Sequence, residues 1–164
     1  AKGGPVHAKY RRMITVYVDI TAPLYWWKEF DTYKIGTVAN SCSTMHKIHV
    51  KEFTLEDFSH EHLTVDDDLY INIKGSDAHA AISLLSQTIQ ALNIYRERYL
   101  ETKIKKYWWQ MIQLLPTSYN QKRTIMLNYE VLVNIRGSRK NHKLDEWSIF
   151  CDWIEDLPYS NIIL

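Results

Sequence analysis

Two shortages in the sequence narrow the class of protein: it has few cysteines and no long apolar run. Cys42 and Cys151 are its only cysteines, and they show no CxxC spacing. Isolated cysteines favour free thiols in a reducing compartment over the disulfides of a secreted domain. No apolar run approaches the roughly 20 residues that a membrane-spanning helix needs, and we expect no signal peptide. These features predict a cytoplasmic protein that does not enter a membrane.

The sequence also lacks a large charge of one sign. Its 20 Lys and Arg residues exceed its 19 Asp and Glu residues by one. A chain with so little net charge has no general attraction for nucleic acid or for an anionic membrane. We therefore expect neither as a partner, and any site that binds an anion must be local.

A convincing set of metal ligands is missing as well. His60, Glu61 and His62 are the nearest approach to one. Alternate residues of a helix point about 200° apart, so the two imidazoles would share a face only on a strand, and no third ligand is indicated. A solvated surface segment is the favoured interpretation, and no metal site is predicted.

Aromatic residues, by contrast, are abundant. They make up 13% of the 164 residues and include 6 Trp and 11 Tyr, within a composition that is otherwise globular. A chain of this length can bury one proper core and is short for two. Surplus aromatic side chains usually enter a core or a subunit interface.

The pattern of apolar residues predicts both a strand and helices. Residues 13–20 alternate between apolar and polar side chains, which is typical of a half-buried strand. Apolar residues between positions 77 and 115 recur every three or four residues, which predicts two long helices that end before Pro116. The sequence therefore predicts an α+β fold. We expect a single domain over residues 1–164, with a twisted, mainly antiparallel sheet packed against the long helices.

Shorter elements are predicted from their ends. Pro23 and Gly36 bracket a helix over residues 24–34. Residues 38–46 are rich in Ser, Thr and Asn and predict a turn, with a short strand after it that runs to Val50.

Two further helices are predicted near the end of the chain. Asn128 is placed to cap a helix that Gly137 ends, and Asp145 to cap a last helix that stops before Pro158.

The stretch 25–49 combines tandem Trp residues, alternating charges, one Gly and a hydroxyl-rich turn. Polar side chains this dense beside aromatic surface suit a pocket for a flat, charged ligand. An amphipathic helix followed by a Ser/Thr/Asn loop explains the same composition more simply, and local composition alone favours that explanation.

Two spaced patterns resemble the flavin-dependent thymidylate synthases of the ThyX family. The family box is Arg-His-Arg, two free positions, Ser, one free position, Asn-Glu, one free position, Ser, one free position and Arg-Tyr. When its Asn is set on Asn40, its second Ser falls on Ser43 and its last residue on His46. Residues 33–35, Tyr-Lys-Ile, stand in place of Arg-His-Arg, so Lys34 is the one cation where the family has two or three.

The second pattern covers most of the last third of the chain. The family has a Leu-Pro pair, then an Asn that opens a helix, then Leu-Arg, and then Ala-Gln-Trp. Leu115-Pro116, Asn128, Arg139 and Trp147 follow in the same order, the first three at very nearly the family's intervals. The Arg that precedes Leu-Pro in the family's nucleotide site has no counterpart here. The resemblance therefore supports the fold more strongly than the chemistry.

The resemblance implies a homotetramer with sites between subunits, FAD as hydride carrier, methylenetetrahydrofolate as carbon donor and dUMP as acceptor. It implies Ser43 as the catalytic residue. Lys34, Asn40 and Asn128 would contact the cofactor, and Ser43, His46 and Arg139 the substrate. We expect Ser43, Asn128 and Arg139 to converge on one cleft, with Lys34 and His46 nearby.

Several of these residues also have an explanation that needs no ligand. Arg139 can bind a phosphate with its planar fork, or pair with Asp145 or Glu146 on the surface. Asn128 can recognise the edge of a ring, or simply cap a helix. Ser43 can contact a nucleotide, or lie in an ordinary turn.

Hypotheses from different classes follow for the function. The first is a ThyX-like enzyme that uses FAD to methylate a pyrimidine deoxynucleotide, dUMP to dTMP, or an altered substrate. The second is a catalytically inactive homologue that binds a nucleotide or a partner protein through the same cleft. A purely structural oligomer is a third, since Trp and Tyr can anchor interfaces.

Overall fold

The computed structural model describes residues 5–41, 43–64, 71–72 and 78–163. The chain forms two compact units. The sheet unit contains the described residues of 1–22, 26–41 and 122–164, and the helical unit contains those of 23–25 and 42–121. The expectation that both units belong to one domain stays a prediction.

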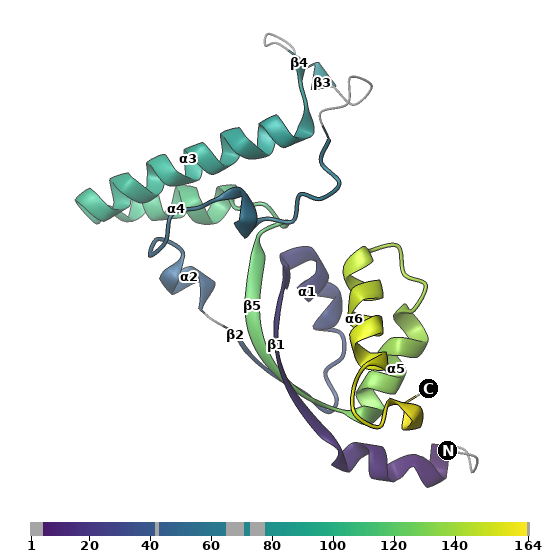
Figure 1. The fold of residues 1–164 in the computed structure, drawn as a ribbon. Helices are drawn as coiled ribbons and strands as arrows, with labels where there is room; N and C mark the ends of the chain where they lie inside the picture. The colour runs from purple at the N-terminus through teal and green to yellow at the C-terminus, as the bar shows by residue number, and fades with distance from the viewer. Residues whose placement is uncertain (1–4, 42, 65–70, 73–77, 164) are drawn as a thin grey trace. The chain divides into compact units, whose positions relative to one another are not determined.

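The sheet unit is built on three strands in the order β1-β5-β2 (Figure 1). They span Thr15–Pro23 (β1), Thr37–Ser41 (β2) and Asn120–Asn128 (β5). Strand β2 runs antiparallel to β5, with Thr37 opposite Leu127 and Ser41 opposite Arg123. Strand β1 also runs antiparallel to β5, because the Tyr129 N–H donates to the Ile14 carbonyl at 3.0 Å and Thr124 donates to Asp19 at 2.6 Å.

The predicted half-buried strand is confirmed as β1. Exposed and half-buried side chains alternate along it from Thr15 to Thr21, and its last two residues are buried. Ile125 and Leu127 on the neighbouring strand are fully buried. The sheet therefore has one face toward the core and one face toward solvent.

The helices described in the sheet unit are η1 (Pro5–Met13), α1 (Leu24–Phe30), α5 (Tyr129–Arg139), α6 (Asp145–Glu155) and η4 (Ser160–Ile162). Residues of α1 and α6 form an aromatic core. Trp26 lies at the centre, with its ring centroid 4.7 Å from Trp147 and 5.1 Å from Phe30. All three side chains are at most 1% exposed, so these aromatics supply core rather than surface.

The helical unit centres on an antiparallel helix pair, α3 (Ala81–Thr102) and α4 (Lys105–Leu114). The sharp turn between them passes through Lys103, which has a positive φ of 56° and donates its N–H to the Tyr99 carbonyl. Leu85, Ile89 and Leu92 on α3 pack with Met111 on α4 in one buried cluster. The three-to-four-residue spacing of the apolar positions therefore predicted the buried face of α3 correctly.

The other elements of the helical unit are short. They are α2 (Thr44–Lys47), η2 (Leu55–Asp57), β3 (Ile71–Asn72) and β4 (Ala78–His79), the last two forming an antiparallel pair. Segment 43–58 contributes Ile48, Phe53 and Phe58 to the same core as α3 and α4.

The region after α1 differs from its prediction. Helix α1 ends at Phe30 rather than Lys34, and Gly36 lies in a turn with a φ of 77°. The expected short strand up to Val50 is wrong: the strand comes earlier, at Thr37–Ser41, and α2 follows it. The pairing with β5 explains why this segment is a strand. Its backbone groups form hydrogen bonds with β5, whereas the prediction had assumed that the local Ser, Thr and Asn side chains would compete for them.

Helix boundaries later in the chain differ as well. Helix α5 continues through Gly137 to Arg139, and α6 begins at Asp145 with Leu144, not Asp145, at the N-cap. Helix α3 begins at Ala81, whereas residues 76–77, at its predicted start, lie outside the described residues.

The sequence also predicted free thiols and no membrane-spanning helix. Cys151 is a free, buried thiol, and Cys42 lies outside the described residues. Among the helices of the described segments, none is long and apolar enough to cross a membrane.

Candidate functional site

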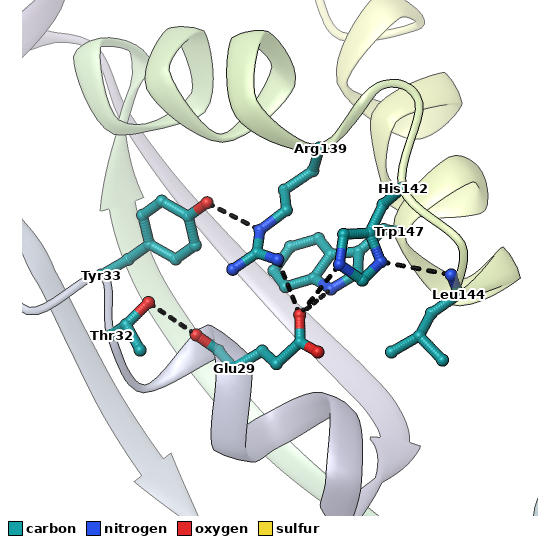
Figure 2. A network of polar contacts seen from close by, with 7 residues as sticks. All are labelled: Glu29, Thr32, Tyr33, Arg139, His142, Leu144 and Trp147. Carbon is teal, nitrogen blue, oxygen red and sulfur yellow. Dashed lines mark hydrogen bonds and ion pairs between the residues drawn. The ribbon is translucent and has the colours of Figure 1, made fainter.

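A single carboxylate oxygen gathers several donors in the sheet unit. Glu29 lies on α1, and its Oε2 accepts hydrogen bonds from Arg139 Nη1 at 2.7 Å and from Trp147 Nε1 at 3.0 Å. His142 Nε2 lies 3.4 Å from the same oxygen. Figure 2 shows these side chains converging from α1, from the end of α5 and from the start of α6. The Glu29 carboxylate thus ties three helices together.

Arg139 is held on several sides. Its Nε donates to the Tyr33 hydroxyl at 3.0 Å, and its guanidinium stacks 4.7 Å from the Trp147 ring centroid (Figure 2). Its side chain is only 19% exposed. The partner is Glu29, which the sequence analysis had not considered for Arg139. A phosphate would have to compete with the Glu29 carboxylate for this guanidinium.

A pocket of about 560 Å³ lies at the N-terminal end of α5, the end opposite Arg139. It is lined by Arg12, Ile35, Gly36, Asn128, Glu130, Val131 and Asn134. Its volume is within the range of small-molecule sites. The lining combines two amides, one ion pair and apolar groups, so the pocket is polar without a marked net charge.

Asn128 caps α5 as the sequence predicted. Its Oδ1 accepts the Val131 N–H at 3.1 Å. Gly36 lies against its side chain, because a Cβ at Gly36 would come within 3.0 Å of Asn128 Nδ2. The simple capping role is therefore confirmed, and the amide that performs it also lines the pocket.

The charges of this pocket neutralise each other. Arg12 donates to both carboxylate oxygens of Glu130, and the distance from its Nη2 to Oε1 is 3.0 Å. The hydrogen bond from Arg12 holds the pKa of Glu130 below its ordinary value, so the pair stays ionised. Uncharged amides beside a neutralised pair suit the edge of a flavin or pyrimidine ring, whereas a diphosphate needs cations that are not already paired.

The remaining predicted site residues are exposed. Lys34 lies in the turn after α1, and Asn40 lies on β2 opposite Thr124. Ser43 precedes α2 and His46 lies within it. The hydroxyl of Ser43 makes no capping hydrogen bond in the described structure, although its carbonyl accepts the Lys47 N–H at 3.1 Å.

The predicted convergence of these residues stays a prediction. Ser43 and His46 belong to the helical unit, whereas Lys34, Asn40, Asn128 and Arg139 belong to the sheet unit. Asn128 and Arg139 mark opposite ends of α5. Arg139 lies eleven positions after Asn128, which corresponds to about 16 Å along the helix axis, so a ligand that contacts both would have to extend along the helix.

Sequence reasoning did not name Glu29 or the Arg12–Glu130 pair. The signal for Glu29 was partly present, since Glu29 and Tyr33 both lie within the polar and aromatic stretch 25–49. Its partners follow 110 or more residues later, beyond the reach of a local pattern. For a metal, the described residues contain no group of three or more His, Cys, Asp or Glu that could hold an ion.

The arrangement of strands and helices places the chain in a known class: it has the ThyX-like α+β fold. The flavin dependent thymidylate synthase ThyX from Helicobacter pylori, solved with FAD and dUMP, matches 98% of this chain and 83% of its own, with a TM-score of 0.60 and 13% identity. The UMP/dUMP methylase PolB from Streptomyces cacaoi, bound with 5-Br UMP, matches 93% of this chain and 76% of its own, with a TM-score of 0.56 and 11% identity. No protein-family model and no curated protein matches the sequence. At such identities the likeness establishes the fold alone.

Proposed function

We propose that this protein binds a pyrimidine nucleotide and methylates it, with dUMP as substrate, FAD as hydride carrier and methylenetetrahydrofolate as carbon donor. One observation carries the proposal: the fold matches, over more than nine-tenths of the chain, two enzymes that were each solved with a pyrimidine nucleotide. The proposal includes membership of the ThyX family as a diverged relative.

The pocket at Asn128 supports a ring-binding role. Its amides supply both donors and acceptors, which the edge of an isoalloxazine or pyrimidine ring requires. FAD, when bound, would carry the hydride. In this proposal Lys34, Asn40 and Asn128 contact the cofactor, Ser43 acts at the reacting centre, and His46 and Arg139 bind the nucleotide.

A second candidate function has an observation of its own. Arg139 already has a carboxylate partner at 2.7 Å, and Lys34 is the one cation among residues 33–35. Both features weaken the binding of a phosphate or flavin diphosphate relative to a site with unpaired guanidinium groups. They favour a homologue that binds a nucleotide or a partner protein without catalysis.

The absorbance of the purified protein and calorimetric titration with dUMP and FAD test the proposal. We expect a flavin absorbance band and binding of both ligands. Arg139→Ala should lower the affinity for the nucleotide by about 10-fold to 100-fold, because a charge-assisted contact contributes roughly 1.5–3 kcal/mol. Arg139→Lys should recover only part of this, since an ammonium group cannot make the bidentate contact.

Arg136→Ala is the matched control. Arg136 lies on the same helix, is similarly shielded and pairs with Glu155 at 2.7 Å, so its loss removes an equivalent ion pair away from the proposed ligand. Colourless protein that is stabilised against heat by dUMP would support the second candidate instead. Absence of dUMP and FAD binding to the unmutated protein would contradict the proposed enzyme and leave the chain ThyX-like by fold alone, and equal affinity in Arg139→Ala would remove Arg139 from the site.

A further inference from the structure

The helical unit contains a separate pocket of about 320 Å³. It is lined by His46, His49, Tyr99, Lys103, Lys105 and Trp108. The two imidazoles come from α2 and the turn after it, and the other four residues from the facing ends of α3 and α4 and the turn between them. Every lining residue belongs to the helical unit, so the pocket is complete within it.

The lining of this pocket includes cationic residues. Two lysines and two histidines are among its lining residues, and none of the lining side chains is a carboxylate. Elsewhere the lysines Lys51, Lys122 and Lys140 pair with carboxylates. Within the described segments, Lys103 and Lys105 have no recorded carboxylate partner and lie instead over aromatic rings, each 5.8 Å from a ring centroid. Like charges that face one cavity favour an anion as its occupant.

His49 adds an unsatisfied polar atom. Its Nδ1 is buried and has no hydrogen-bond partner among the described residues. Its backbone is fixed, since Arg96 Nε donates to the His49 carbonyl at 3.0 Å, and its ring meets the Tyr99 ring edge-on at 5.0 Å. Because this atom is closed off from solvent, a ligand in the pocket would reach it only if the His49 ring turned.

The rest of the lining is aromatic. Tyr99 and Trp108 are half-buried and pack against the apolar cluster of α3 and α4. Their rings offer flat surface beside the cationic groups, and aromatic surface stacks favourably on a planar ring. The volume lies near the lower end of the range for small-molecule sites, so the ligand must be small.

We propose that this pocket binds a small phosphorylated compound with a planar ring. The phosphate is held by Lys103, Lys105 and His46, and the ring lies against Tyr99 and Trp108. The site goes beyond the proposed nucleotide reaction and shares only His46 with the residues assigned to it. It does not use Arg139 or Asn128.

Calorimetric titration of the full chain with phenyl phosphate, inorganic phosphate and phenol tests this inference. Phenyl phosphate carries both features without being a pyrimidine or a flavin, so its binding is independent of the proposed function. We expect phenyl phosphate to bind at least about tenfold more tightly than either of the others, a difference of roughly 1.4 kcal/mol. The imidazole nitrogen signals of His49 should shift in NMR spectra during the titration.

Single-charge variants locate the site. Lys103→Gln and Lys105→Gln should each lower the affinity for phenyl phosphate by about fivefold or more. The effect of each variant should be smaller at high salt, because salt screens the interaction between the charges. Lys106→Gln is the matched control, because it removes the same charge from the neighbouring exposed position outside the pocket lining, and should leave the affinity unchanged.

Several outcomes would overturn the assignment. Equal affinity for phenol and phenyl phosphate would exclude the charge contact, and equal affinity for inorganic phosphate would exclude the ring contact. Unchanged affinity in both Lys103→Gln and Lys105→Gln would exclude this pocket as the binding site.

One outcome would support the assignment further. Loss of dUMP binding in Arg139→Ala with phenyl phosphate binding retained would show that the two sites are separate.

Discussion

The Glu29 carboxylate shows how one side chain can fix the ends of three helices. Trp147 is fully buried, and its indole N–H needs an acceptor, which Glu29 provides at 3.0 Å. The same oxygen accepts from Arg139, so the negative charge that satisfies the indole is itself balanced. If Arg139 binds a phosphate of the nucleotide, that interaction must be stronger than the one that Arg139 already makes with the Glu29 carboxylate. This competition is the physical reason that fold likeness does not by itself carry activity to this chain.

A second carboxylate makes the stability of the helical unit depend on pH. Burial acts to raise the pKa of Asp57, but hydrogen bonds from Lys51 and from the Thr54 backbone outweigh it, and the pKa lies below its ordinary value of 3.8. Lys51 Nζ lies 2.5 Å from Oδ1, and the Thr54 N–H donates to Oδ2 at 2.9 Å. Because folding lowers this pKa, the stabilisation is present above about pH 4 and is lost as the pH falls through the folded-state value.

Asp57→Asn should therefore lower the free energy of unfolding at pH 7 by about 1 kcal/mol, the scale of a helix-cap interaction. The loss of stability between pH 5 and pH 3 should be shallower than in the unmutated protein. Urea unfolding at a series of pH values measures both effects. Glu56→Gln removes one charge from the adjacent exposed residue and serves as the control; a variant of Asp57 that unfolds with the unmutated pH dependence would contradict the argument.

The contrast between Asn128 and Arg139 shows which site features a sequence can predict. The cap of Asn128 closes over three residues, so composition and spacing predicted it. The partner of Arg139 lies 110 residues away, and its identity depends on how α1 and α5 pack. Local patterns give the chemistry that a residue can offer, whereas tertiary packing decides which partner accepts it.

At the level of elements, strong apolar periodicity predicted strands and helices correctly, whereas a single helix-breaking residue did not predict where a helix ends. The alternation of β1 and the apolar spacing of α3 both follow from one buried face, and the structure confirms them. Gly137 did not end α5, because the helix is anchored on both sides of it by buried Ile135 and by the contacts of Arg139. A helix held by tertiary contacts tolerates the roughly 1 kcal/mol cost of one internal glycine.

This difference between glycines predicts opposite effects for the same substitution. Gly137→Ala should raise the free energy of unfolding by about 0.5–1 kcal/mol, because a Cβ there meets nothing within 4 Å and alanine is the better helix former. Gly36→Ala should lower it by about 1–2 kcal/mol, since the φ of 77° disfavours a Cβ that would also approach Asn128 Nδ2 at 3.0 Å. Thermal or urea unfolding of both variants compares them directly. Destabilisation by Gly137→Ala would show that α5 is strained at this point.

At the scale of the whole molecule, the outer face of the sheet carries exposed apolar side chains. Val38 is 60% exposed and lies opposite Met126, and the same antiparallel register places Tyr17, 75% exposed, on the far side of Met126. Cross-strand neighbours project from the same face of a sheet. The three side chains therefore form an apolar row across the sheet, of the kind that subunit interfaces cover.

We predict that the protein forms a homotetramer and that this row contributes to its contacts. Light scattering at micromolar concentration should give four times the mass of one chain. Val38→Lys should shift the mass toward smaller species, because a charge buried in an apolar interface is costly unless it is paired. Ser148→Lys, which adds the same charge at an exposed position of α6, should leave the mass unchanged. A monomer mass for the unmutated protein would exclude the tetramer and any site shared between subunits, whereas a tetramer that persists in Val38→Lys would place the interface elsewhere.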